Sequence, residues 1–317
     1  MIAKQNIPPK VYLVTGVHND WAHTQKFLNC AQSQTYKNLE IIVVDDGSTD
    51  GTSNKIINNY PNVRLIEGGG TLWWTGCLFA AVNEVLMTAK TNDYLLTINN
   101  DCTFDQDFII NMIYVSKRNP NCVIGSLGID NIDKNTIIDS GAKIDWLRGR
   151  VFRAGFNNLK DVPKNFLYDS KVDTLTTRGT LYPMSIIKNV GNFDNKHFPH
   201  YISDFEYACR VKRHGFGLVI AYECKIYNDT KRTGFSGPEN KPISLLEYRK
   251  TLFGRKSQIN IIDHYNFVRM CCPWYLQPLN YMYLIAKFIY ISSFLPPFFP
   301  FRMPIVKLRK LLLSKVE

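Results

Sequence analysis

The sequence predicts an α/β protein, with a mostly parallel sheet flanked by helices and a basic, aromatic-rich helical extension at its C-terminal end. Three observations predict this class. Short apolar runs alternate with amphipathic stretches through the first hundred residues, as they do in repeated βαβ units. Three of these runs are followed by polar or glycine-rich clusters, which is where open parallel sheets bind ligands. Positive charge is concentrated at the C-terminal end of the chain.

The first two expected strands lie at 11–17 and 40–44. The first is rich in β-branched residues, which is typical of a strand covered on both faces. Between them, residues 21–34 place apolar side chains at nearly helical spacing and predict a helix. The second strand stops at a pair of aspartates, and residues 48–52 offer the side chains that cap helices, so a helix is expected from there to Tyr60.

The next two expected strands also end in polar or glycine clusters. A strand at 63–66 precedes the three glycines of 68–70, and a helix is expected around 75–89. A strand at 94–98 stops at Asn99, Asn100 and Asp101. Any one cluster has an ordinary explanation, because Asp, Asn, Ser and Gly dominate turns. Three clusters at one edge of the same sheet favour a ligand site.

The second half is less regular and contains the expected domain boundary. Residues 121–180 mix short strands with loops, and an amphipathic helix is expected near 203–214. Proline, glycine and polar residues gather at 235–243. We therefore expect an α/β domain over 1–240 and a helical extension over 241–317.

The net charge of +11 belongs to the extension. Residues 1–240 contain 26 Lys and Arg against 24 Asp and Glu, whereas residues 241–317 contain 12 against 3. A basic aromatic segment can bind nucleic acid or an anionic bilayer, but 281–301 is too apolar for nucleic acid. Lys287 and Pro296 interrupt its apolar run, so we expect it to lie in a membrane interface and not to span. Packing on the α/β domain is the alternative.

The cysteine pattern indicates the cellular compartment in which the protein is expected. The eight cysteines form no CxxC pair, and the first ten residues do not resemble a secretory signal. We therefore expect reduced thiols and a cytoplasmic protein, peripheral on the inner face of the cell membrane.

Three sequence segments resemble a known family. VDDGSTDGT at 44–52, after TGVHN at 15–19, is similar to the opening of family 2 glycosyltransferases, which have the Rossmann-like GT-A fold. The segment 191–216 resembles the family's G-x-FD…ED-x-D-x-x-x-R stretch, and 99–101 falls where the family keeps a DxD-type motif. The resemblance covers roughly 10–240. It implies an inverting transfer of a hexose or deoxyhexose from a nucleotide sugar, as in bacterial rhamnosyl- and hexosyltransferases that build capsule or O-antigen.

The residue types suit a nucleotide-sugar donor. Asp45 or Asp46 can accept hydrogen bonds from a base and a ribose, which favours UDP- or dTDP-sugars over GDP-sugars. Trp73 and Trp74 are adjacent, so one of them is expected to face the ligand and stack on a sugar, unless both are core residues. The donor-binding residues expected from the residues and the resemblance are Thr15, Asp45, Asp46, Gly70, Trp74, Asn100, Arg178 and Gly179.

The resemblance implies a metal site at Asp101 and Asn99. Mg²⁺ or Mn²⁺ prefers oxygen ligands and would offset charge on the leaving diphosphate. Asn99 departs from the family's acid and brings no charge, and Asn228 and Asp229 stand where a metal-assisting histidine is often found. The alternative for Asp101 is a cap for a helix beginning near Asp105.

Asp204 is the expected general base, which takes the proton of the acceptor hydroxyl. Ser203 replaces the family's first acid, while Glu206 and Arg210 match its later acid and arginine and can form an i,i+4 ion pair. Asp204 could also be the N-cap of its helix. His200, close by in sequence, is expected on the acceptor side.

The expected partners are a nucleotide sugar, a glycan or lipid-linked saccharide acceptor, and a membrane surface. A nucleotidyltransferase would need a phosphate loop rich in glycine and basic residues after the first strand, and 14–19 has none. A catalytically silent glycan-binding or scaffold protein is a further alternative, because acids are replaced at Asn99 and Ser203. A processive synthase is disfavoured, since no set of membrane-spanning runs follows the α/β domain.

Overall fold

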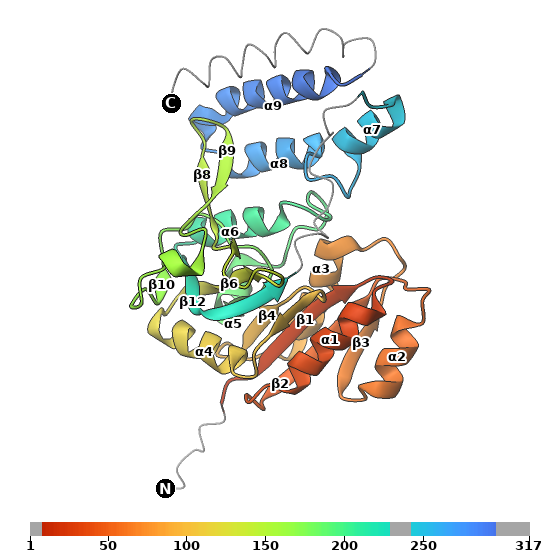
Figure 1. The fold of residues 1–317 in the computed structure, drawn as a ribbon, viewed down its shortest axis with the longest axis vertical. Helices are drawn as coiled ribbons and strands as arrows, with labels where there is room; N and C mark the ends of the chain where they lie inside the picture. The colour runs from red at the N-terminus through yellow and green to blue at the C-terminus, as the bar shows by residue number, and fades with distance from the viewer. Residues whose placement is uncertain (1–7, 229–241, 296–317) are drawn as a thin grey trace, which may run out of the picture. The chain divides into compact units, whose positions relative to one another are not determined.

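The computed structural model describes residues 8–228 and 242–295 (Figure 1). The chain divides into two compact units, the first comprising Met1–Ile144 and Val151–Arg232, and the second Asp145–Arg150 and Thr233–Glu317. The expected boundary between 240 and 241 falls outside the described residues, so the division into 1–240 and 241–317 stays a prediction.

The first unit is built on a ten-stranded sheet, in which eight strands follow the order β10-β12-β6-β11-β4-β1-β2-β3, with β5 on β12 and β7 on β6. Strands β1 to β4 pair in parallel, as do β6 and β12. Strand β11 runs antiparallel between β4 and β6. The strands of this sheet are β1 Val11–Val17, β2 Leu39–Asp45, β3 Val63–Glu67, β4 Tyr94–Thr97, β5 Cys102–Phe104, β6 Cys122–Asp130, β7 Ile137–Asp139, β10 Tyr168–Asp169, β11 Thr180–Pro183 and β12 Gly217–Asn228. Strands β8 Ala142–Asp145 and β9 Arg150–Arg153 pair with each other in a separate two-stranded sheet.

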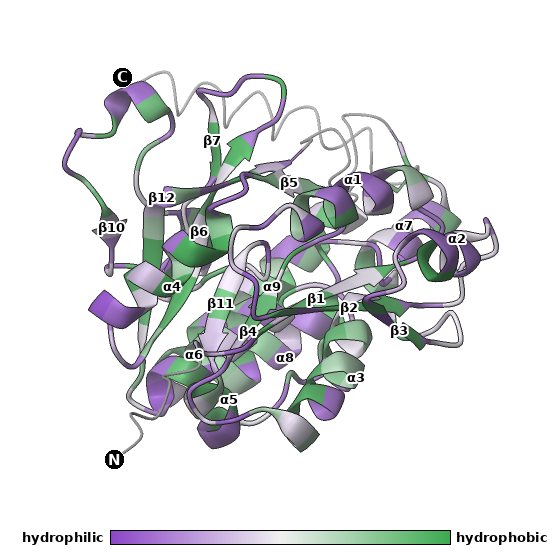
Figure 2. Ribbon diagram, turned by 90° about the horizontal axis from the view of Figure 1, so that it is seen from below, coloured by the Kyte–Doolittle hydropathy of each residue, from purple (hydrophilic) through white to green (hydrophobic). Residues whose placement is uncertain are grey.

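Helices cover both faces of this sheet. They are α1 Trp21–Gln32, α2 Thr52–Asn59, α3 Trp73–Thr88, α4 Phe108–Arg118, α5 Met184–Val190 and α6 Ser203–Arg213, with a 3-10 turn η1 at Leu159–Asp161. Alternate residues of β1 enter two separate cores: Val14 packs in the cluster that contains Leu78 of α3, and Leu13 in the cluster that contains Phe27 of α1. In Figure 2 strands β1, β2 and β6 are mostly green, as strands buried on both faces should be. The predicted α/β class is confirmed.

The second unit is helical in its described part. It contains α7 Leu245–Phe253, α8 Ile261–Cys271, the 3-10 turn η3 at Trp274–Leu276 and α9 Gln277–Ser292. Asn260 caps α8 by accepting hydrogen bonds from the backbone N–H groups of Ile262 and Asp263. Among the described helices, none is long and apolar enough to cross a bilayer. The expected interfacial segment 281–301 is described only as far as residue 295.

Helix α6 is held in place by a buried ion pair. The Arg210 Nε and Nη2 atoms lie 2.8 and 2.9 Å from the two carboxylate oxygens of Glu206, which is 3% exposed. Arg210 Nη1 also donates to the backbone carbonyls of Val190 and Asn192, at 3.2 and 2.9 Å. The Glu206–Arg210 pair therefore fixes the first turns of α6 against the end of α5, and this sets the position of Asp204.

We expect Arg210→Met to lower the free energy of unfolding by about 3–5 kcal/mol, because it leaves the Glu206 carboxylate buried without a partner. Replacing both residues (Glu206→Gln with Arg210→Met) should recover part of this loss. Lys212→Met is the control in the same helix. Lys212 pairs with Asp173 across a partly exposed contact, so its loss should cost about 0–1 kcal/mol. Denaturant unfolding measures all three variants, and equal effects of R210M and K212M would contradict this account.

Candidate active site

The ends of β2 and β3 are joined through Asp46. Its carboxylate accepts hydrogen bonds from the backbone N–H of Gly70 at 2.7 Å and of Trp73 at 2.9 Å. Gly47 has a φ of +70°, and a Cβ on it would lie 2.8 Å from the Gly70 nitrogen, so only glycine fits this approach of the two loops. The imidazole of His18 contacts the Asp46 carbonyl at 2.6 Å. The first two polar clusters therefore form one connected surface.

Asp45 and Asp46 are both almost fully buried. Asp45 accepts hydrogen bonds from the Ser48 N–H at 2.9 Å and from the Ser53 hydroxyl. Thr15 lies on β1, and its hydroxyl oxygen is buried without a hydrogen-bond partner among the described residues. Both aspartates order their own loops, and their contacts with a base or ribose stay a prediction.

The end of β4 supplies the third cluster. The side-chain amide of Asn100 donates to the Thr24 hydroxyl at 3.1 Å and to Asp20 at 3.4 Å. Asp101 accepts a hydrogen bond of 3.2 Å from the Asn228 side chain, at the end of β12. Helix α4 begins at Phe108 and its N-cap is Asp107, so the alternative role of Asp101 as a helix cap is wrong.

The residue types at Asn99 and Asp101 suit a divalent cation, and a metal site there stays a prediction. The side-chain oxygen of Asn99 is buried and has no hydrogen-bond partner in the described part of the chain, which costs free energy unless a ligand satisfies it. Across residues 8–228 and 242–295, no group of three or more His, Cys, Asp or Glu side chains could hold a metal. One carboxylate and an amide oxygen, completed by diphosphate oxygens, match the way Mg²⁺ is usually held. Asp229 lies outside the described residues.

The two tryptophans at the start of α3 take different roles. The indole N–H of Trp74 donates to the Thr177 hydroxyl at 2.8 Å, and its ring packs against the core. Trp73 has a φ of +59°, which is strained for a residue with a side chain. Its ring lies 5.5 Å from the His200 ring in an edge-to-face arrangement. Trp73 is thus adjacent to the segment that leads into α6, while sugar stacking by Trp74 stays a prediction.

Arg178 lies on a loop that is pinned to the sheet. The Gly179 N–H donates to the Thr97 carbonyl at 2.9 Å. Gly179 has a φ of +73°, and a Cβ there would lie 2.2 Å from the Ser126 hydroxyl oxygen. The Arg178 Nε atom is buried with no hydrogen-bond partner among the described residues. Burial disfavours its charged form, but the carboxylates of Asp139, Asp101 and Asp204 outweigh this and raise the pKa of Arg178.

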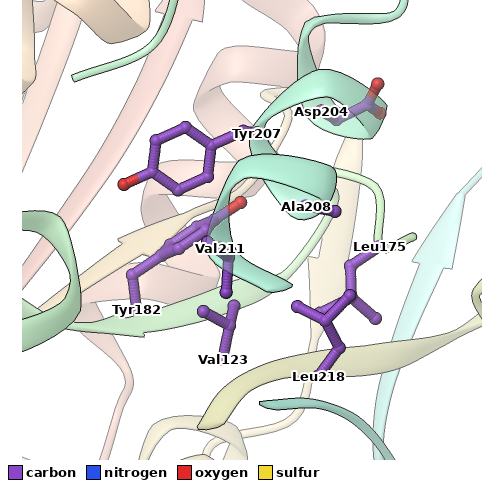
Figure 3. Close-up of a pocket in the computed structure, with 8 residues that line it drawn as sticks. All are labelled: Val123, Leu175, Tyr182, Asp204, Tyr207, Ala208, Val211 and Leu218. Atoms are coloured by element: carbon purple, nitrogen blue, oxygen red, sulfur yellow. The ribbon is translucent and has the colours of Figure 1, made fainter. Parts of the chain in front are cut away.

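Asp204 lies in the first turn of α6, whose N-cap is Ile202, so the expectation that Asp204 could be the N-cap is wrong. Its Oδ1 accepts a hydrogen bond of 2.9 Å from the Phe205 N–H. Burial, reinforced by the charge of Asp139 and opposed by Arg178, raises the pKa of Asp204 to about 6. Figure 3 shows the carboxylate directed away from the apolar side chains that pack beneath α6.

Sequence reasoning missed Asp139, at the end of β7. This carboxylate is 9% exposed. It accepts hydrogen bonds from the Gly141 N–H at 3.0 Å and from the Thr176 hydroxyl, two residues before Arg178. Asp139 therefore links the β7 turn to the loop of Arg178 and adds a negative charge beside Arg178 and Asp204. The Asp-Ser-Gly run at 139–141 is a turn signal that marks the place but gives no hint of these neighbours.

Comparison with known proteins finds a matching family and several relatives of this chain. The profile of Glycosyl transferase family 2 matches residues 12–177, just over half of the chain. An N-acetylglucosaminyl-diphospho-decaprenol L-rhamnosyltransferase of Mycobacterium tuberculosis is 26% identical over 230 residues, covering 68% of this chain and 74% of that protein. An uncharacterized protein of Sinorhizobium fredii is 26% identical over 150 residues, which span 45% of this chain and only 16% of that longer protein.

A solved structure shares the fold. It is the mannosyltransferase PcManGT from Pyrobaculum calidifontis, in complex with GDP-Man and Mn²⁺. The TM-score is 0.54 at 13% sequence identity, over 91% of this chain and 76% of that one. At this identity the likeness concerns the fold, and it confirms the GT-A architecture that the sequence predicted.

The raised pKa of Asp204 makes a stability prediction. A carboxyl whose pKa rises from 3.8 to about 6 on folding destabilises the native state once it ionises, so this cost appears as the pH rises through that interval. We expect Asp204→Asn to increase the free energy of unfolding by about 1–3 kcal/mol near pH 8 and by much less near pH 4. The matched control is Asp105→Asn, at an exposed site, which should change the free energy of unfolding by less than about 0.5 kcal/mol. A D204N effect that does not grow with pH would contradict the burial of this charge.

Proposed function

Because the chain belongs to glycosyl transferase family 2, we propose that this glycosyltransferase enzyme inverts the anomeric centre of a UDP- or dTDP-sugar. The sugar, a hexose or deoxyhexose, passes to a hydroxyl of a lipid-linked glycan in the synthesis of a bacterial surface polysaccharide such as capsule or O-antigen. The position and ionisation of Asp204 carry the proposal.

Asp204 suits the role of general base. With a pKa of about 6 its carboxylate is ionised at neutral pH and is more basic than an exposed aspartate, which favours proton transfer. The acceptor oxygen forms a bond to the anomeric carbon while the bond from that carbon to the diphosphate breaks. The acceptor proton passes to Asp204, and the nucleoside diphosphate leaves.

Arg178 supplies positive charge on the proposed donor side. Arg178 has a buried Nε without a partner among the described residues, and a diphosphate oxygen is a suitable acceptor for it. The Asp46–Gly70 contact holds the loops in which the base and ribose are proposed to bind. Asp101 and Asn99 would hold a Mg²⁺ or Mn²⁺ ion, which as a Lewis acid would offset charge on the leaving diphosphate. The structural neighbour is named with GDP-Man and Mn²⁺, in keeping with this assignment.

The acceptor proposal rests on the mycobacterial relative. Its name specifies a sugar on a diphosphate-linked polyprenol, which is a membrane-anchored acceptor. The basic, aromatic C-terminal segment of this chain suits attachment to the membrane that holds such an acceptor. We therefore place the enzyme at the inner face of the cell membrane, as a peripheral protein.

A donor-binding screen tests the proposal. We expect the purified chain to show a higher melting temperature with one class of nucleotide sugar in the presence of Mn²⁺, equivalent to about 2.7 kcal/mol at a hundredfold the Kd. Asp101→Ala should lose the metal-dependent part of the shift, whereas Asp204→Ala should keep it, because Asp204 is assigned to the acceptor. UDP-, dTDP-, GDP- and CMP-sugars are compared with and without the metal. If none of them shifts the melting temperature, the protein is a silent glycan-binding scaffold and not a transferase.

The pH dependence of kcat/KM tests the base. We expect an acid limb near pH 6, with activity rising as Asp204 loses its proton. Asp139→Asn removes a like charge that raises the pKa of Asp204, so the limb should move to lower pH. Asp105→Asn serves as the control, since Asp105 is exposed. If Asp139 only holds its loop, D139N will lower the maximal kcat/KM and leave the pH of the acid limb unchanged.

A further inference from the structure

Helix α9 has two faces of different character. Asn280 and Ile291 are 3% and 2% exposed and mark the inner face. The Asn280 amide donates to the carbonyl of Trp146 at 2.8 Å, which anchors this face within the second unit. Met282, Ile285 and Ile289, at helical spacing on the opposite side, are 65%, 59% and 63% exposed. Exposed apolar side chains that adjoin on one helix face are a candidate interaction surface.

The single charged residue of α9 is turned to the inner side. Lys287 is half-buried, and its Nζ lies 3.0 Å from Nε2 of His264 on α8. Burial and the neighbouring lysine lower the pKa of His264 to about 4, and burial lowers the pKa of Lys287 to about 8. At neutral pH the imidazole is therefore uncharged, and its Nε2 contacts both the Lys287 Nζ and, at 3.1 Å, the Gln258 carbonyl. Lys287 interrupts the apolar run in the sequence, but it does not interrupt the exposed stripe.

The unit that carries the stripe also exposes aromatic and basic side chains. Trp274 and Tyr275, in η3 directly before α9, are 81% and 64% exposed. Such rings are favoured at the level of lipid headgroups, because each has an apolar body and a polar group. Within 242–295 the exposed charged side chains are one acid, Glu247, and five bases: Arg249, Lys250, Arg255, Lys256 and Arg269. This charge complements an anionic surface.

We propose that the stripe of Met282, Ile285 and Ile289, continued by Trp274 and Tyr275, lies in the headgroup region of an anionic bilayer, with α9 parallel to the membrane plane. The sixteen residues of α9 extend over about 24 Å, less than the ~30 Å of a bilayer core, which agrees with an in-plane position. A second copy of the chain fits this face less well, because a twofold contact would bring two equally basic units together. The inference rests on the proposed function in that a membrane-anchored acceptor requires the enzyme at this surface.

Vesicle binding by the full chain tests the assignment. Vesicles of phosphatidylcholine mixed with phosphatidylglycerol are compared with vesicles of phosphatidylcholine alone, by co-sedimentation without donor or acceptor. We expect Ile285→Glu and Ile289→Glu each to lower the partition coefficient on the mixed vesicles by about tenfold or more. Ile57→Glu is the matched control, since Ile57 is 55% exposed on α2 of the first unit and the change in charge is the same. Lys287→Leu should leave binding unchanged, because its charge is not on the stripe.

Three outcomes would overturn the assignment. In the first, the unaltered chain does not bind the mixed vesicles. In the second, I285E and I289E weaken vesicle binding no more than I57E does. In the third, light scattering finds a dimer that I285E converts to a monomer, which would make a second copy the occupant of the stripe. Melting shifts with nucleotide sugars, measured on the same variants, separate this test from the proposed function. A variant that loses vesicle binding but keeps the donor shift supports both.

Discussion

Three carboxylates, from Asp101, Asp139 and Asp204, share the field of one buried guanidinium, that of Arg178. They come from the end of β4, the end of β7 and the first turn of α6, so this charge balance involves segments more than one hundred residues apart. Without Arg178, burial and the charge of Asp139 would raise the pKa of Asp204 further. With it, Asp204 keeps a pKa at which it is ionised at neutral pH and still basic. The loops that hold Arg178 and the ion pair that holds α6 therefore control the chemistry as much as the acids do.

The strands of the first hundred residues and the polar clusters after them could be predicted because both depend on local patterns. Runs such as 11–17 and 40–44 are apolar over most of their length, which indicates a strand covered on both faces, and parallel pairing then brings their ends to one edge. The antiparallel insertion of β11 between β4 and β6 leaves no such pattern. The same holds for Asp139, whose importance comes from Thr176 and Arg178 and not from its neighbours in sequence.

For the two aspartates that carry the family resemblance, the contacts expected from the sequence differ from the contacts found in the structure. From the sequence, Asp45 and Asp46 suit a base and a ribose. In the structure both carboxylates accept hydrogen bonds from the chain itself, and those of Asp46 come from the backbone of Gly70 and Trp73. The two functions are compatible, because each carboxylate oxygen has a second lone pair. The internal hydrogen bonds order the loops before a donor arrives, which lowers the entropy that binding must remove.

Strained and unsatisfied groups are concentrated at the edge of the sheet that carries the candidate site. Trp73 and Ile202 both have positive φ values, at +59° and +68°, and strain of this kind costs of order 1–3 kcal/mol per residue. Trp73 contacts His200, and Ile202 directly precedes Ser203 and Asp204. The buried oxygen of Asn99 and the buried charge of Asp204 add further unfavourable terms. The ligand proposed for this site, with hydroxyl and diphosphate groups, would relieve or use each of these features. Their coincidence is a physical argument for catalysis at this edge, because a protein that only packed or only bound a partner would gain stability by losing them.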